Sequence, residues 1–172
     1  MWSSEPGLLL RLLALAALLA ATACGFHPIY QGKEARAVVP DLAAIEVNPL
    51  YGRQGSFLRN YLLDEFNPQS VQVAAAYRLN VTVRAETNTL AIQLDNSPTR
   101  ANYTLGATFV LTRISDGQVV YDSATRRVVS YNVRNDPFAT LAAEQDAERR
   151  ASREVARQIR TILSLYFADQ AA

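Results

Sequence analysis

The side chains that most often carry catalysis or hold metals are scarce in this chain. It contains one histidine, His27, and one cysteine, Cys24. A Ser-His-Asp or Cys-His arrangement in the body of the protein is therefore not expected, and a metal cluster of histidine and cysteine ligands is excluded by number. The seven glycines are scattered and form no glycine-rich phosphate loop. The sequence predicts a protein that is not an enzyme and that needs no cofactor and no metal.

An excess of charge of either sign is also missing. The chain has 17 Lys and Arg against 16 Asp and Glu, which gives a formal net charge of +1. A protein that binds nucleic acid normally presents a strongly basic face. The charge balance therefore argues against nucleic acid as a partner.

What the chain does have is a clear N-terminal pattern over residues 1–23. Arg11 precedes an apolar run from Leu12 to Ala20, and the small residues Ala21 to Ala23 then precede Cys24. This order is typical of a secretory signal peptide. About 12 uncharged residues are too few for a transmembrane helix, which needs roughly 20. Small residues before a cysteine resemble the bacterial lipobox, whose cysteine becomes acylated; the alternative is an ordinary secreted protein with a stray cysteine.

A lipid on Cys24 would fix where the protein resides. More than one acyl chain makes anchorage stable, because each buried methylene contributes roughly 0.8 kcal/mol. Gly25 stands where an aspartate would resemble an inner-membrane retention signal. We therefore expect a lipid anchor on the periplasmic side of the outer membrane. The predicted organisation is a signal peptide at 1–23, a lipidated N-terminus and tether at 24–40, and one domain at 41–172.

Hydrophobic periodicity in the domain predicts the order strand, helix, three strands, helix. The expected strands span residues 43–48, 77–84, 102–112 and 119–133, with an Asp-Gly hairpin turn at 115–118 before the last one. We expect that last strand to be bulged near residues 122–124. The first helix, around residues 57–66, should end at Asn67-Pro68.

The last helix is the strongest prediction from the pattern. Asp136 is placed to cap it, with Pro137 at the first helical position. Its apolar residues form one stripe, which comprises Ala151, Val155, Ile159, Ile162, Leu163 and Tyr166. The arginines on its other faces are best interpreted as the solvated side of a docked helix. Two helices on one face of a mostly antiparallel four-stranded sheet predict an α+β two-layer sandwich (βαβββα).

The heptapeptide Cys24–Tyr30, CGFHPIY, resembles the CGFxPLY opening of the outer-membrane lipopolysaccharide-assembly lipoproteins, the LptE family. Ile29 stands in place of that family's leucine. The predicted element order also resembles the sandwich of this family. The resemblance implies a protein that plugs the large β-barrel LptD, helps it assemble and contacts lipopolysaccharide on its way to the cell surface. The alternative is another outer-membrane lipoprotein that acts as an accessory subunit or scaffold of an envelope lipid-transport system.

Lipopolysaccharide carries phosphates, which favour arginine because its guanidinium offers several donors in a fork. The candidate ligands lie on or near the predicted strands, and they are Arg100, Arg113, Arg126, Arg127 and Arg134. The alternative is that they are ordinary arginines facing solvent or a partner. The loop at Asn96 to Pro98 is expected to make partner contacts.

Overall fold

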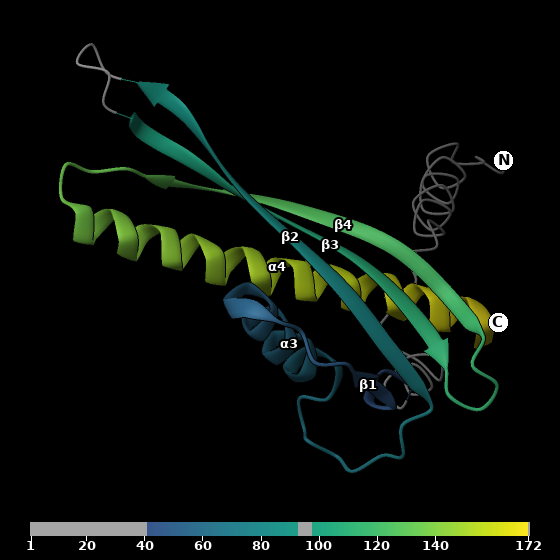
Figure 1. Ribbon diagram of the computed structural model, residues 1–172. Coiled ribbons are helices and arrows are strands. Elements are labelled where there is room, and N and C mark those ends of the chain that lie inside the picture. The colour runs from purple at the N-terminus through teal and green to yellow at the C-terminus, as the bar shows by residue number, and fades with distance from the viewer. Residues whose placement is uncertain (1–40, 93–97, 172) are drawn as a thin grey trace, which may run out of the picture. The chain divides into compact units, whose positions relative to one another are not determined.

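A computed structural model describes residues 41–92 and 98–171 (Figure 1). The elements follow the chain as β1 (Ile45–Val47), α3 (Gly52–Phe66), β2 (Tyr77–Ile92), β3 (Pro98–Arg113), β4 (Val119–Asn132) and α4 (Pro137–Ala171). The predicted α+β class and element order are confirmed. The predicted signal peptide, Cys24, the tether and the loop residues 93–97 lie outside the described residues.

The four strands form one sheet in the order β1-β2-β3-β4. β2, β3 and β4 pair antiparallel, and β1 pairs parallel to β2 with Ile45 opposite Tyr77. A parallel pair needs a crossover connection, which α3 provides. The sheet is therefore mostly antiparallel, as predicted.

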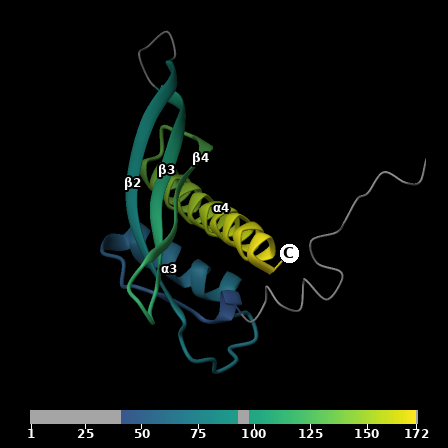
Figure 2. The same cartoon turned by 90° about the vertical axis from the view of Figure 1, so that its right-hand side faces the viewer.

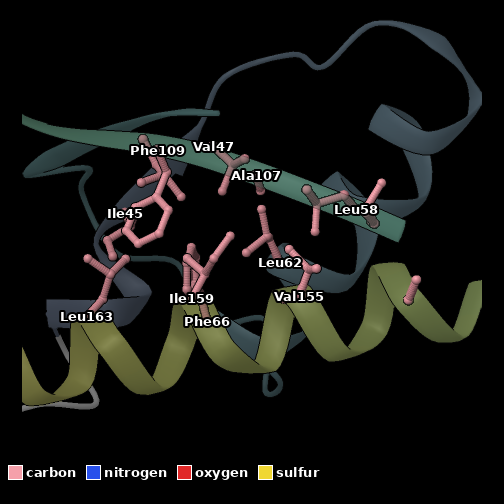
Figure 3. Packing of buried hydrophobic residues seen from close by; sticks show 14 of the residues in the cluster. Ile45, Val47, Leu58, Leu62, Phe66, Ala107, Phe109, Val155, Ile159 and Leu163 are labelled. Carbon is pink, nitrogen blue, oxygen red and sulfur yellow. The ribbon is translucent and has the colours of Figure 1, made fainter. Parts of the chain in front are cut away.

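One face of the sheet is covered by α3 and α4 (Figure 2). Alternate residues of β3 point into this layer and are buried: Ala101, Tyr103, Leu105, Ala107, Phe109 and Leu111. They meet α4 residues such as Val155, Ile159 and Leu163, which are 0% exposed (Figure 3). The predicted stripe on the last helix is confirmed, with Ile162 and Tyr166 half-buried at its margin.

The opposite face of the sheet carries no helix within the described part of the chain. The side chains on this face alternate along each strand with those that point towards the helices. Examples are Arg84 on β2, Thr108 on β3 and Arg126 on β4, and all three are exposed. We call this the outer face. Among the described residues, no helix is both long and apolar enough to cross a membrane.

The predicted cap of α4 is present. Asp136 Oδ1 accepts a hydrogen bond from the Phe138 N–H at 2.9 Å. The arginines of this helix depart from the prediction, because several contact α3 instead of pointing only to solvent. Arg157 and Arg160 each lie 3.4 Å from a carboxylate oxygen of Glu65, and Arg153 lies 5.1 Å from the centre of the Tyr61 ring.

Several element boundaries differ from the sequence prediction. β1 spans Ile45–Val47 instead of the predicted 43–48, because residues 41–43 are helical. α3 begins at Gly52, earlier than predicted. β2 continues to Ile92, well beyond its predicted end at residue 84, and β3 begins at Pro98, well before its predicted start at residue 102. The bulge predicted near residues 122–124 is wrong by about two residues. The register shifts where Leu111 faces Tyr121 and Thr112 faces Val119, which makes Val120 the extra residue beside the hairpin turn.

Candidate functional site

The structure does not gather the five predicted arginines into one site. Arg100 and Arg134 meet at one end of the sheet, whereas Arg113 lies at the other end of β3. The strand between Arg100 and Arg113 spans about 43 Å at roughly 3.3 Å per residue. Arg126 and Arg127 are neighbours on β4, so their side chains point to opposite faces.

Arg100 and Arg134 line a pocket of about 400 Å³, which we call the end pocket. Its other lining residues come from β4 and α4, and they are Ser130, Tyr131, Asn132, Ala143, Asp146 and Arg150. Arg100 faces Asn132 in the sheet register. The backbone of Arg134 is fixed by Thr140, whose hydroxyl accepts from the Arg134 N–H at 2.9 Å and donates to its carbonyl at 3.0 Å. Both arginines are therefore held on structured backbone.

The electrostatics of the end pocket favour an anion. Three guanidinium groups line it against one carboxylate, that of Asp146. Asp146 Oδ2 already accepts a hydrogen bond from Arg150 Nε at 2.7 Å, and Arg149 Nη2 lies 3.9 Å from Oδ1. At the wall, burial and the negative charge of Glu144 raise the pKa of Tyr131, which keeps its hydroxyl neutral. Such a set of donors suits a phosphate or carboxylate ligand.

The sequence analysis missed Arg150. Its spacing from Asp146 predicts the ion pair between them, because residues four apart are neighbours on a helix. Its position beside Arg100 depends on how α4 crosses the sheet, and the sequence pattern does not contain that angle. The end pocket therefore consists of two predicted arginines and one that only the packing of α4 reveals.

A second basic surface lies in the middle of the outer face, and we call it the central depression. It has a volume of about 540 Å³ and is lined by Arg84, Ala85, Glu86, Thr104, Gly106 and Arg126. Arg84, Gly106 and Arg126 are directly opposite one another across β2, β3 and β4. Two strand spacings separate the arginines by about 10 Å at the backbone. Because Gly106 has no side chain, the space between the two guanidinium groups is open.

The two remaining predicted arginines have protein partners. The Arg127 guanidinium lies on the helix side of β4 and donates to Gln158 Oε1 of α4 and to the Arg126 carbonyl. Arg113 Nη1 lies 2.9 Å from Asp116 Oδ2 in the hairpin turn, and this bond raises the pKa of Arg113. The hydrogen bond from the Gln118 N–H lowers the pKa of the Asp116 carboxyl, and the hydrogen bond from Arg113 lowers it further. Neither arginine lines the end pocket or the central depression.

Clustered metal ligands are not found in the described part of the chain: no three or more His, Cys, Asp or Glu side chains there are arranged to hold a metal ion. The groups that converge are arginines and neutral polar side chains. The arrangement can therefore bind an anion or a polar partner surface.

A helix-backed sheet with one open polar face and a basic end pocket defines an α+β binding domain. Residues 42–163 match the LptE family, which is described as lipopolysaccharide-assembly. The match spans more than half of the chain, so this protein belongs to the LptE family. A search of the curated proteins finds no match.

Solved structures agree with this assignment. A Caulobacter crescentus protein described as a lipoprotein is 28% identical, with a TM-score of 0.65 over 78% of this chain and 98% of that one. The rare lipoprotein B of Shewanella oneidensis is 13% identical, with a TM-score of 0.57 over 74% of this chain and 97% of that one. A minor lipoprotein of Acinetobacter baumannii is 19% identical, with a TM-score of 0.53 over 71% and 91% of the two chains. The last two similarities show the fold alone.

Family membership confirms the predicted LptE resemblance through residues 42–163, whereas the opening heptapeptide lies outside the matched residues. The chain is a lipopolysaccharide-assembly lipoprotein, and the family implies the outer membrane as its location.

Proposed function

We propose that this protein is anchored through Cys24 on the periplasmic side of the outer membrane, where it plugs and helps assemble the β-barrel LptD and assists lipopolysaccharide insertion. The observation that carries the ligand-binding part is the convergence of Arg100, Arg134 and Arg150 in the end pocket. The role is one of binding and assembly, without catalysis.

The end pocket matches the chemistry of a lipopolysaccharide headgroup. A volume of about 400 Å³ is within the range of small-ligand sites, which begins near 300 Å³. Charge-assisted hydrogen bonds from arginine to phosphate contribute about 1.5–3 kcal/mol each. Because the Arg150 side chain is 45% exposed, salt should weaken these contacts.

The outer face supports the plug proposal. The lumen of a large transmembrane barrel is polar, so a plug must present polar surface to it. The outer face provides this surface with arginine, threonine and asparagine side chains from three strands, including Arg84, Thr108 and Asn80.

The ligand-binding part is tested by charge reversal. We expect the double variant Arg100→Glu, Arg134→Glu to bind lipopolysaccharide at least about tenfold more weakly, since tenfold corresponds to about 1.4 kcal/mol. The control is Arg113→Glu, a single charge reversal at the far end of β3 and outside the end pocket, which should bind as the parent does. Binding is measured on purified mature protein at low and high salt. Equal losses in the double variant and the control would contradict the end pocket.

The barrel part is tested separately. We expect a pull-down from detergent-solubilised outer membrane to recover LptD. Depletion of the protein should lower the amount of assembled barrel and make the membrane permeable to large hydrophobic antibiotics. Recovery of a different envelope partner, with normal barrel levels, would instead indicate an accessory subunit of another lipid-transport system.

A further inference from the structure

The connection between α3 and β2, residues 67–76, is a surface that the proposed plug role does not use. It contains no charged residue in ten positions, and we call it the uncharged loop. Val71 is 52% exposed and Val73 is 43% exposed. With Ala43, Phe66, Asn67, Pro68 and Gln69, these valines line a pocket of about 250 Å³. Single exposed valines are ordinary, but an uncharged stretch of this length with an apolar pocket is not.

Hydrogen bonds fix the loop in this conformation. Asn67 Nδ2 donates to the Val71 carbonyl at 2.8 Å, and its Oδ1 accepts from the Val71 N–H at 2.9 Å. Ser70 takes a left-handed backbone conformation with φ of +50°, which turns the chain between Asn67 and Val71. At the far end, Ala76 N–H donates to the Ala44 carbonyl at 2.9 Å. The valines are therefore held at the surface by a built loop.

The loop lies where the described chain begins. Ala43 is part of the apolar pocket, and the carbonyl of Ala44 holds the end of the loop. The predicted tether, residues 24–40, joins this point to Cys24. A lipid on Cys24 would tether the domain to the bilayer at this end, because the sequence enters the domain here.

The uncharged loop is also at the opposite end of the sheet from the end pocket. The loop leads into Tyr77 at the start of β2, which pairs with Arg113, whereas Arg100 lies at the other end of β3. Figure 1 shows the loop below β1 and α3, away from the C-terminal end of β2. The domain thus presents the uncharged loop at the end where the described chain begins, and the end pocket at the opposite end of the sheet.

We propose that the uncharged loop docks on the lipid leaflet that holds the anchor, with Val71 and Val73 inserted at the boundary of headgroups and acyl chains. The loop has no charge to desolvate, and apolar area gains about 25 cal/mol per Å² on leaving water. Two valines bind weakly by themselves, but the tether raises their effective concentration at the membrane to the millimolar range. This inference rests on the proposed acylation of Cys24 and is independent of lipopolysaccharide and LptD.

The experiment uses the acylated protein in vesicles of phosphatidylethanolamine and phosphatidylglycerol, with no barrel present. An acylated Cys24 has no free thiol and is the chain's one cysteine, so Val73→Cys accepts a single environment-sensitive fluorophore. The matched control is Thr108→Cys, an exposed position on the outer face. We expect lipid-attached quenchers to quench the label at residue 73 several-fold more strongly than the label at residue 108. A second variant, Val71→Asp with the label at residue 73, should lose most of this quenching while keeping the circular dichroism of the parent.

Equal quenching at both positions would overturn the proposal, as would quenching that Val71→Asp leaves unchanged. A change in the fluorescence of the label at residue 73 that appears only after the barrel is added would also overturn the proposal, because the loop would then contact a protein instead of lipid. Mass spectrometry of the same sample reports acylation of Cys24. Lipopolysaccharide binding and barrel recovery are separate measurements, so failure of the loop proposal is distinguishable from failure of the proposed function.

Discussion

Arg53 of α3 and Glu148 of α4 form an ion pair between the two helices, with 2.9 Å between Nη2 and Oε2. The Glu148 side chain is 1% exposed, whereas that of Arg53 is 55% exposed. Apart from this ion pair, the Glu148 carboxylate oxygens have no hydrogen-bond partner among the described residues. The buried carboxylate therefore depends on one half-exposed arginine for its stabilisation.

The first prediction follows from this asymmetry. Arg53→Ala leaves a buried carboxylate without its partner, which typically costs 3–5 kcal/mol. Because water reaches Arg53, we expect a smaller loss of unfolding free energy, about 2 kcal/mol. Adding Glu148→Leu should restore most of it, since the unpaired charge is then removed. Urea unfolding of the two variants measures this, and a double variant less stable than Arg53→Ala would contradict it.

The second prediction concerns alkaline pH. Burial, followed by the negative charge of Glu148, raises the pKa of Tyr103 from 10.0 to about 12. The unfolded chain therefore loses this proton first, so the stabilisation is fully present below pH 10 and is lost as the pH rises towards 12. A difference of two pKa units corresponds to about 3 kcal/mol. Tyr103→Phe should unfold less readily than the parent above pH 10, as measured by denaturant unfolding across the pH series. Parallel stability curves for the two proteins would refute the assignment.

The third prediction tests the contact between α4 and the sheet. Ile159 is 0% exposed, so Ile159→Asp places a charge in an apolar layer and should cost several kcal/mol, on the order of 4. The matched control is Thr161→Asp, which puts the same charge at an exposed position of the same helix. Thermal unfolding compares them, with the control expected to melt close to the parent. Similar melting temperatures for both variants would show that Ile159 is not in the core.

The fourth prediction concerns Gly106 at the floor of the central depression. A Cβ there would come no closer than 3.7 Å to the Arg84 carbonyl, so the backbone does not require glycine. Threonine suits a strand better than glycine, by up to about 1 kcal/mol. Gly106→Thr should therefore fold with equal or higher stability while narrowing the depression. A clear loss of stability in denaturant unfolding would mean that the outer face packs against something at this point.

The fifth prediction concerns the anchor. Cys24→Ser removes the thiol that would be acylated, so we expect the chain to remain unprocessed or to be released from the membrane. Membrane fractionation and mass spectrometry of the mature N-terminus measure this. An unmodified Cys24 in the native mature protein would refute the lipid anchor.

Sequence periodicity predicted the layers of this fold because each half-buried strand alternates. Leu79, Val81 and Val83 point towards the helices, and their neighbours point away. The pattern failed from Ala85 onward, although β2 continues to Ile92. Ala85 to Thr89 are exposed on both faces, so no apolar alternation marks the far half of β2. A strand that buries neither face gives no periodic signal.

The candidate site was harder to predict than the fold. Arg126 and Arg127 are both candidates on the last predicted strand. Adjacent strand residues point apart, however, and Arg127 donates to Gln158 on the buried side. Arg84 joins Arg126 only through the register of three strands. Arg150 joins Arg100 only through the docking of α4. Sequence spacing supplies the side chains, whereas pairing register and helix crossing decide which of them meet.

The position of α4 after all four strands has a consequence for folding. This helix, Pro137–Ala171, is the cover for Leu105, Ala107 and Phe109 on β3, which are 0–2% exposed in the folded protein. A chain secreted from its N-terminus delivers the three-stranded meander first and its cover last. Until α4 arrives, this apolar sheet surface lacks its cover and can associate with other unfinished chains. For a secreted chain, chaperones that hold unfolded proteins should therefore matter most in the interval before the 35 residues of α4 arrive.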